Sequence, residues 1–171
     1  MDRVLGAWGV GMSPARALAI RPATAADAPA LAAQRVAMFH EMGHTPVAGP
    51  EAFERQSAGA FADALERGVC CAWVADSGSA LVGSVALLIY PRLPSPALAA
   101  TQEGYLLNVY TVPEWRGRGV ATALVATALA KARALKLARV RLHATAQGQP
   151  IYAAAGFIAR ADEMELTLEA S

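Results

Sequence analysis

The sequence has little cysteine, little charge and no long apolar run, and each shortage excludes a class of protein. Its only two cysteines, Cys70 and Cys71, are adjacent in a strand-like segment. Their side chains should point to opposite faces, so we interpret them as small core residues in a reducing compartment rather than as a redox pair. The formal net charge is +1 and there is no long basic run, so the sequence gives no sign of a nucleic-acid-binding surface. No apolar run approaches the roughly 20 residues of a membrane helix, and we therefore expect a cytoplasmic protein.

The composition is otherwise that of a folded protein with a large core. Hydrophobic residues make up 55% of the 171 residues and charged residues 17%, which argues against disorder. This length suits one domain. We expect a flexible extension over residues 1–16, whose apolar stretch is too weak for a signal peptide, followed by a single domain over residues 17–171.

The pattern of apolar residues and turn residues predicts alternating strands and helices. Thr24 and Asp27 resemble a capping box that opens the first helix, which runs to about Met42 and ends at Gly43. Residues 91–101 contain three prolines and are expected to form a loop. Further helices are expected at 51–66, at 120–135 and around Tyr152. Strands are expected at 17–20, 69–75, 80–90, 103–112, 139–143 and 164–168, which gives a mixed α/β sheet.

Residues 108–121 are the most informative segment for function. An apolar strand leads into a proline, then into a turn rich in arginine and glycine, and then into an alanine-rich helix. The first amides of a helix have no intrahelical partner and lie at its positive end, so they can bind an anion. Gly117 and Gly119 add no side-chain bulk, while Arg116 and Arg118 supply positive charge. The segment therefore predicts a phosphate-bearing cofactor at a strand-to-helix turn.

Two common phosphate-binding motifs do not fit this turn. The P-loop requires Gly-Lys followed by Ser or Thr, which is absent here. The dinucleotide fingerprint requires a third glycine or alanine where Thr122 stands, and a carboxylate about 20 residues further on, where residues 139–141 read Arg-Val-Arg. The pattern Arg-x-x-Gly-x-Gly/Ala does fit, through Arg116, Gly119 and Ala121, and it resembles the GNAT superfamily of N-acetyltransferases.

A second segment, residues 149–157, supports this resemblance. It reads Gln-Pro-Ile-Tyr-Ala-Ala-Ala-Gly-Phe and resembles the short helix of the family that carries a tyrosine and ends in Gly-Phe. One helix, one strand and one loop separate the two motifs, as in the family. One departure is Thr145, which stands before Tyr152 where the family commonly has an asparagine that helps to hold pantetheine. The resemblance covers the chain from about residue 18 to residue 168.

The resemblance implies a GNAT fold of the α/β (α+β) class, with a mixed, mostly antiparallel sheet of about six to seven strands flanked by about four helices. In this fold two central strands splay apart, and the pantetheine arm of acetyl-CoA lies in the gap like an added strand. A backbone N–H near Val109 would polarise the acetyl carbonyl. The residues implied in binding acetyl-CoA are Val109, Tyr110, Thr111, Val112, Arg116, Gly117, Arg118, Gly119, Val120, Ala121 and Thr122.

The reaction implied is direct transfer of an acetyl group from acetyl-CoA to a primary amine of a small molecule or peptide. An alkyl ammonium has a pKa of about 10.4, so it must lose its proton before it attacks. Tyr152 matches the general acid of the family, which would protonate the departing thiolate. The candidates for the base are Glu103 and Glu41. Asn108 could orient the acceptor or a water, and a chain of waters without a dedicated base is an equal alternative.

The acceptor pocket of the family is walled by the end of the first helix and the loop after it. The residues that would recognise the substrate here are Arg35, Phe39, Glu41 and Met42. The loops at 43–51 and 91–101 would then set the choice of acceptor. Amino acids, polyamines, antibiotics and peptide termini all remain open as acceptors. Dimers are common in the family, so a homodimer is also compatible with the resemblance.

One motif competes with this interpretation. Residues 40–44 read His-Glu-Met-Gly-His, the H-E-x-x-H signature of zinc peptidases. On a helix the two histidines would share a face and bind zinc, with the glutamate as general base. No third ligand is evident nearby, and Pro46 would end the helix. A milder variant has His40, His44 and His143 hold an incidental metal, but we predict no metal site. A third hypothesis is a catalytically silent GNAT fold that senses acyl-CoA.

Overall fold

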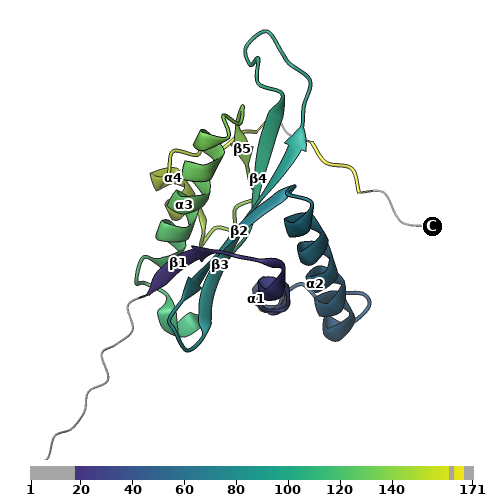
Figure 1. Cartoon of the computed structure of the whole chain (residues 1–171), viewed down its shortest axis with the longest axis vertical. Coiled ribbons are helices and arrows are strands. Elements are labelled where there is room, and N and C mark those ends of the chain that lie inside the picture. The colour runs from purple at the N-terminus through teal and green to yellow at the C-terminus, as the bar shows by residue number, and fades with distance from the viewer. Residues whose placement is uncertain (1–17, 162–163, 168–171) are drawn as a thin grey trace, which may run out of the picture.

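The computed structural model describes residues 18–161 and 164–167 of the chain (Figure 1). The extension expected over residues 1–16 lies outside the described residues. The described elements are, in chain order, β1 (Ala19–Pro22), the 3-10 turn η1 (Ala25–Asp27), α1 (Ala28–Glu41), α2 (Pro50–Glu66), β2 (Cys70–Asp76), β3 (Leu81–Pro91), β4 (Gln102–Thr111), the 3-10 turn η2 (Pro113–Trp115), α3 (Val120–Ala134), β5 (Val140–Arg141) and α4 (Gln149–Ala154). None of the helices described here is both long and apolar enough to cross a bilayer.

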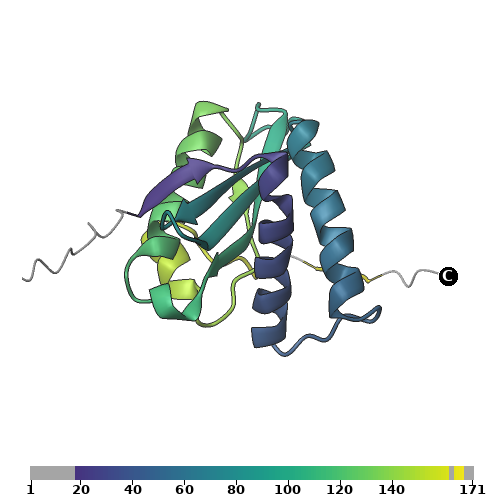
Figure 2. The same ribbon diagram turned by 60° about the horizontal axis from the view of Figure 1, so that its bottom comes forward.

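The strands form one five-stranded sheet in the order β1-β2-β3-β4-β5. The pairs β1–β2, β2–β3 and β3–β4 are antiparallel, whereas β4 and β5 run parallel. Figures 1 and 2 show α1 and α2 on one face of the sheet and α3 and α4 on the other. The expected mixed, mostly antiparallel sheet with four flanking helices is therefore confirmed.

Each face of the sheet has its own apolar core. Leu87, Leu106 and Leu124 belong to the cluster that α3 covers, and Leu31 and Phe61 belong to the cluster under α1 and α2. Full burial of such a side chain contributes about 1.5–3 kcal/mol, so several on each face hold both helix layers against the sheet. The central strand β4 is thereby fixed from both sides, and the groups along it have defined positions.

The sequence-based prediction of the last two strands was wrong in part. β5 contains only Val140 and Arg141 instead of residues 139–143, because the chain leaves β4 after that point. Residues 164–167 lie in no strand. Met164 and Leu166 are exposed there, so they contribute no apolar contact that would hold the segment on the sheet. Within the described residues the sheet therefore has five strands, not six or seven.

The capping residues before α1 and the glycines after α1 and α2 predicted these helix ends correctly. Thr24 and Asp27 form the expected capping box, in which the Thr24 N–H donates to Asp27 Oδ2 at 2.8 Å. The box opens η1, which continues into α1. Gly43 and Gly68 follow α1 and α2 with φ of 79° and 68°, the left-handed conformation that closes a helix and that glycine adopts without strain.

Candidate active site

The edge of β4 that faces β5 is open over half of its length. Parallel pairing joins only Gly104 to Val140 and Tyr105 to Arg141. From residue 106 to residue 111, β4 has its antiparallel neighbour β3 on one side and no described strand on the other. Half of the backbone N–H and C=O groups over this stretch therefore face a gap, as along any unpaired strand edge. The predicted splay between the two central strands is confirmed.

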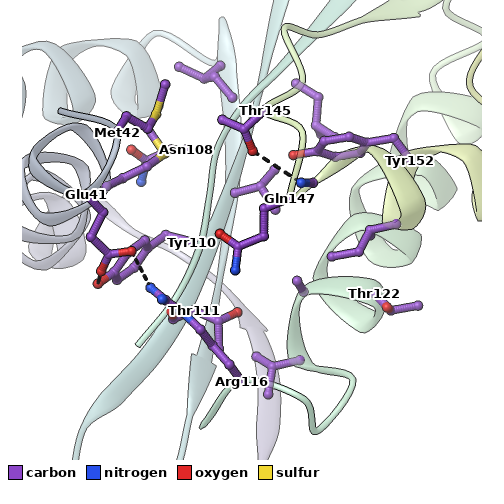
Figure 3. Close-up of a pocket in the computed structure, with 18 of the residues that line it drawn as sticks. Glu41, Met42, Asn108, Tyr110, Thr111, Arg116, Thr122, Thr145, Gln147 and Tyr152 are labelled. Atoms are coloured by element: carbon purple, nitrogen blue, oxygen red, sulfur yellow. Dashed lines mark hydrogen bonds and ion pairs between the residues drawn. The ribbon is translucent and has the colours of Figure 1, made fainter. Parts of the chain in front are cut away.

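A cavity of about 1030 Å³ occupies this gap. α1 and β4 line one side of it, and the turn before α3 together with α4 lines the other (Figure 3). The expected acceptor-binding residues Arg35, Phe39, Glu41 and Met42 all line the cavity. The expected cofactor-binding residues that line it are Val109, Tyr110, Thr111, Arg116, Gly117, Gly119, Val120, Ala121 and Thr122. The structure thus brings together residues that lie far apart in the sequence.

A bulge in β4 sets which side chains reach the cavity. Ser84 pairs with Tyr110, but Ala86 pairs with Leu107, so β4 has one more residue than β3 over this interval. Asn108 has a φ of 52°. Because a bulge inserts one residue, the side-chain alternation shifts by one position beyond it. Leu107 packs on the α1–α2 side and Val109 on the α3 side, and Tyr110 returns to the side of α1.

Asn108 itself is almost fully buried. Its amide nitrogen donates to the backbone oxygen of Leu31 at 3.3 Å and to Ser84 Oγ at 3.1 Å, which fixes the bulge to α1 and β3. Its Oδ1 has no hydrogen-bond partner within the described part of the chain. Asn108 also lines the cavity, but this oxygen is itself shielded from solvent, so in this structure Asn108 fixes the bulge rather than presenting its oxygen to a bound molecule.

The turn between β4 and α3 presents backbone amides to the cavity. Gly117 and Gly119 have φ of 71° and 77°, and no atom would lie within 4 Å of a Cβ added at either position. Gly119 is the N-cap of α3, and no side chain caps the helix. The first amides of α3 are therefore available at the positive end of the helix. The residues present fit a phosphate-bearing group.

Arg116 links this turn to α1. Its Nη2 lies 2.6 Å from Glu41 Oε2, and its Nε donates to the Thr111 carbonyl at 2.9 Å. The Tyr110 hydroxyl donates to the other oxygen of Glu41 at 2.9 Å (Figure 3). Burial alone would raise the pKa of Glu41, but the hydrogen bonds from Arg116 and Tyr110 hold it below its ordinary value. Glu41 is thus a charged carboxylate that is already bonded twice.

Two expected cofactor contacts lie outside the cavity. Arg118 does not line it, and its guanidinium lies 5.1 Å from the centre of the Trp115 ring. Val112 does not line it either, because its N–H donates to Val82 and its carbonyl accepts from Trp115. Neither the Arg118 charge nor the Val112 backbone therefore faces the cavity in this structure.

Tyr152 is held by the way α4 ends. Gly156 has a φ of 96°, and the Phe157 N–H donates to the Tyr152 carbonyl at 3.0 Å, which is the hydrogen-bonding pattern of a Schellman motif. The two rings then pack edge to face with centroids 5.9 Å apart. A Cβ at Gly148 would lie 2.9 Å from Tyr152 Cε2. The sequence Tyr-x-x-x-Gly-Phe thus holds the Tyr152 ring in place through Phe157. The absence of a side chain at Gly148 leaves space for the other edge of the ring.

The Tyr152 hydroxyl points from α4 toward β4 across the cavity (Figure 3). Burial raises the pKa of this phenol above its ordinary value. Tyr152 therefore keeps its proton at neutral pH. A protonated hydroxyl at this place can donate a hydrogen bond or a proton to a group in the gap.

Glu103 lies away from the cavity, in a cluster of arginines. Its carboxylate, only 3% exposed, lies 2.6 Å from Arg92, 2.8 Å from Arg139 and 3.4 Å from Arg141. Burial would raise the pKa of Glu103, but these neighbours outweigh it and lower that pKa. The structure thus does not bring Glu103 to the other expected catalytic residues, and its contacts hold the start of β4 beside β5.

One polar pair at the cavity was not predicted from the sequence. The Tyr105 hydroxyl is hydrogen-bonded to Nδ1 of His143, and both side chains line the cavity. Tyr105 comes from the last paired residue of β4, and His143 follows the end of β5. The position of His143 just beyond a strand that neighbours the central strand was the available signal. A neutral imidazole has one ring nitrogen that can accept a hydrogen bond or a proton.

The H-E-x-x-H motif does not lie on one helix. α1 ends at Glu41, and Gly43 closes it at positive φ. The His44 N–H donates back to the Phe39 carbonyl at 3.0 Å, so His44 has left the helix and its ring packs against Phe39. Among the described residues no three histidine, cysteine, aspartate or glutamate side chains are grouped so that they could hold a metal ion.

Comparison with known proteins agrees with this geometry. The family model described as the acetyltransferase (GNAT) family matches residues 36–157, which include β4, the turn before α3 and α4. The chain is similar to a GCN5-related N-acetyltransferase from Ralstonia eutropha JMP134, with 29% identity, a TM-score of 0.80 and coverage of 89% of this chain and 99% of that chain. The comparison with curated proteins returned no match.

More distant structures share the fold. A predicted acetyltransferase with acetyl-CoA from Clostridium acetobutylicum has 22% identity and a TM-score of 0.81, over 88% of this chain and 96% of that chain. Glucosamine-6-phosphate N-acetyltransferase from Arabidopsis thaliana has 15% identity and a TM-score of 0.64, over 90% of this chain and 99% of that chain.

Proposed function

Since the chain belongs to the acetyltransferase (GNAT) family, we propose that it transfers an acetyl group from acetyl-CoA to a primary amine of a small molecule or peptide, directly within a ternary complex. The observation that carries this proposal is the open edge of β4, which borders one cavity together with the amide-lined turn before α3 and the Tyr152 hydroxyl. Acetyl-CoA supplies the acetyl group as a thioester. A nitrogen–carbon bond forms and the carbon–sulfur bond breaks, while the amine loses a proton and the thiolate gains one.

The backbone around the gap supports binding of acetyl-CoA. The amides at the start of α3 would hold the pyrophosphate, because Gly117 and Gly119 leave them open. The unpaired groups of β4 between residues 106 and 111 would bond the pantetheine amides in the manner of strand addition. Val109 lies in the bulge and has no partner in the β3 register. Its N–H would therefore act as an oxyanion-type donor to the acetyl carbonyl.

Tyr152 would act as the general acid. It is the phenol of the described chain that points from α4 into the gap (Figure 3), and burial raises its pKa, so it carries its proton at neutral pH. A thiolate that leaves the acetyl carbon is basic and gains from a nearby donor. Tyr152 can give its proton there and recover one from solvent after the products leave.

We place the proton acceptor at the pair formed by His143 and Tyr105. Glu103 lies in its arginine cluster outside the cavity, and Glu41 is occupied by Arg116 and Tyr110. His143 is exposed and lines the cavity, so it can pass a proton from the amine to solvent. Tyr105 fixes the orientation of the ring through Nδ1. Asn108 would act by position, because its bonds to Leu31 and Ser84 fix the bulge that contains Val109.

The cysteines support direct transfer. Cys70 is buried in β2, and burial raises the pKa of its thiol to about 11. Neither Cys70 nor Cys71 lines the cavity. A thiol with a raised pKa, away from the acyl donor, is a poor nucleophile. We therefore propose no acetyl-cysteine intermediate, and the free thiols suit a cytoplasmic location.

The test is turnover with a broad panel of primary amines. Purified protein is incubated with acetyl-CoA and each amine, free thiol is followed over time, and the product is identified by mass. We expect one or more amines to yield an N-acetyl product in an amount equal to the thiol released. Saturable binding of acetyl-CoA without any acetylated amine would contradict this function and favour the silent, acyl-CoA-sensing alternative.

A further inference from the structure

Arg35 is a half-buried cation without an anionic partner. It lies on α1 and lines the cavity. Its guanidinium carbon lies 4.8 Å from the centre of the Phe39 ring and 5.9 Å from the centre of the Phe53 ring. Within the described part of the chain it forms no ion pair and no side-chain hydrogen bond. Burial lowers the pKa of the guanidinium, with no carboxylate nearby to offset the effect.

The charges around the cavity make this position unusual. Among the described residues that line it, the charged side chains are Arg35, Glu41 and Arg116. Glu41 and Arg116 neutralise each other at 2.6 Å. The charge of Arg35 therefore remains uncompensated. A guanidinium does not lose its proton in proteins, so a desolvated one without a carboxylate costs free energy until an anion reaches it.

The surroundings of Arg35 are apolar. Met38 and Phe39 on α1 and Met42 just after it also line the cavity, and Phe39 packs edge to face on Phe53 at 5.7 Å. Contact with both rings restrains the planar guanidinium, so that little side-chain freedom is lost when a planar anion binds. A carboxylate fits this geometry, because it accepts two parallel hydrogen bonds from one guanidinium.

We propose that Arg35 binds a carboxylate of the acceptor, and that the acceptor is a small amine with both a carboxylate and an apolar body, such as an amino acid. This inference rests on the proposed function, because only that function makes the bound molecule an acetyl acceptor. Arg35 lies on the α1 side, whereas the phosphate-binding turn lies before α3. The carboxylate of the acceptor and the phosphates of acetyl-CoA would thus occupy opposite ends of the cavity.

The first experiment compares amino acids with their amides. The values of kcat/KM are measured for the proteinogenic L-amino acids and for the matching L-amino acid amides. The amide amine loses its proton more readily, so any preference for the acid reflects recognition of the carboxylate. We expect at least one acid to be preferred by about 10- to 100-fold, the effect of one charge-assisted hydrogen-bonded pair. In Arg35→Met, which keeps an apolar side chain, the ratio should fall to near one. Arg55→Met, an exposed position on α2 outside the cavity, should keep the wild-type ratio.

A second experiment separates this inference from the proposed function. Protein loaded with CoA is titrated calorimetrically with N-acetyl amino acids and with N-acetyl amino acid amides, which requires no chemistry. Tighter binding of the acids by tenfold or more, lost in Arg35→Met, supports the carboxylate site even if no amine is ever acetylated. Equal binding of every acid and its amide overturns it. A tenfold loss of acetyl-CoA affinity in Arg35→Met overturns it as well, because the anion would then belong to the cofactor.

Discussion

The Arg116 guanidinium lies 2.6 Å from the Glu41 carboxylate, so the turn before α3 is tied to the last residue of α1. The two residues come from opposite sides of the gap beside β4. The same carboxylate accepts a hydrogen bond from Tyr110, which the bulge in β4 turns toward α1. One carboxylate therefore fixes the end of α1, the central strand and the turn before α3 relative to one another.

Replacing Glu41 should weaken binding of acetyl-CoA without abolishing it. Glu41→Gln removes the charge that holds Arg116, and a half-exposed ion pair contributes about 0.2–1 kcal/mol. We therefore expect the Kd for acetyl-CoA to rise by up to about fivefold in calorimetry. Glu66→Gln, at an exposed position of α2, is the matched control and should bind as the wild type does. A loss of binding altogether would mean that Glu41 contacts the cofactor itself.

The Glu41 link also predicts a pH dependence. The pKa of Glu41 is lower in the folded protein than its ordinary value of 4.5. The contribution of the Glu41 charge is therefore fully present above pH 4.5, and it is lost as the pH falls through the lower pKa of the folded protein. Between pH 5 and 7 the difference in acetyl-CoA affinity between wild type and Glu41→Gln should stay constant. A difference that disappears already at pH 6 would show that the carboxylate is not held by Arg116 and Tyr110.

Tyr152→Phe should lower kcat by about 100-fold or more, which is the usual contribution of a positioned general acid. Because its pKa is raised, Tyr152 is protonated up to alkaline pH, and the loss should be the same from pH 6 to pH 8. The KM for acetyl-CoA should change little. Tyr90→Phe is the control, since Tyr90 bonds Glu103 outside the cavity. Full turnover by Tyr152→Phe would remove the acid assignment.

His143→Gln should slow the reaction most where the amine is protonated. We expect kcat/KM to fall by about 100-fold at pH 7, the lower end of the usual contribution of a positioned general base. The deficit should shrink as the pH rises, because the amine then loses its proton without help. His40→Gln, exposed on α1 and outside the cavity, is the control. A deficit that is independent of pH would indicate that His143 only supports the wall of the cavity.

Short sequence motifs predicted those parts of the site that are formed by residues close together in the chain. Gly117 and Gly119 mark the turn before α3 because their φ is positive, and Gly156-Phe157 positions Tyr152 through the end of α4. The two motifs therefore stood out in the sequence. The apolar run likewise predicted β4 nearly to its ends, since both faces of this strand are covered.

Contacts between distant residues could not be predicted in this way. Glu41 and Arg116 are 75 residues apart, and nothing in either segment indicates the other. The arginines around Glu103 are Arg92, which follows β3, and Arg139 and Arg141 at β5. These residues are distant in the sequence, so Glu103 looked catalytic although it is paired. The bulge at Asn108 also depends on packing against α1 and β3. Catalytic roles follow from such contacts, which explains why the fold was easier to predict than the base.

The proposed function depends above all on whether the amides at the start of α3 hold the phosphates of acetyl-CoA. Calorimetric titration of acetyl-CoA into the wild type, Ala121→Glu and Ala123→Glu tests it most directly. Ala121 lines the cavity in the first turn of α3, whereas Ala123 is exposed outside it, and a glutamate in the first turn of a helix is compatible with folding. We predict binding to the wild type in the micromolar range and to Ala123→Glu with similar affinity. For Ala121→Glu we predict an affinity at least about 100-fold weaker, because like charges a few ångströms apart repel. No binding to the wild type, or equal binding to all three proteins, would contradict the account.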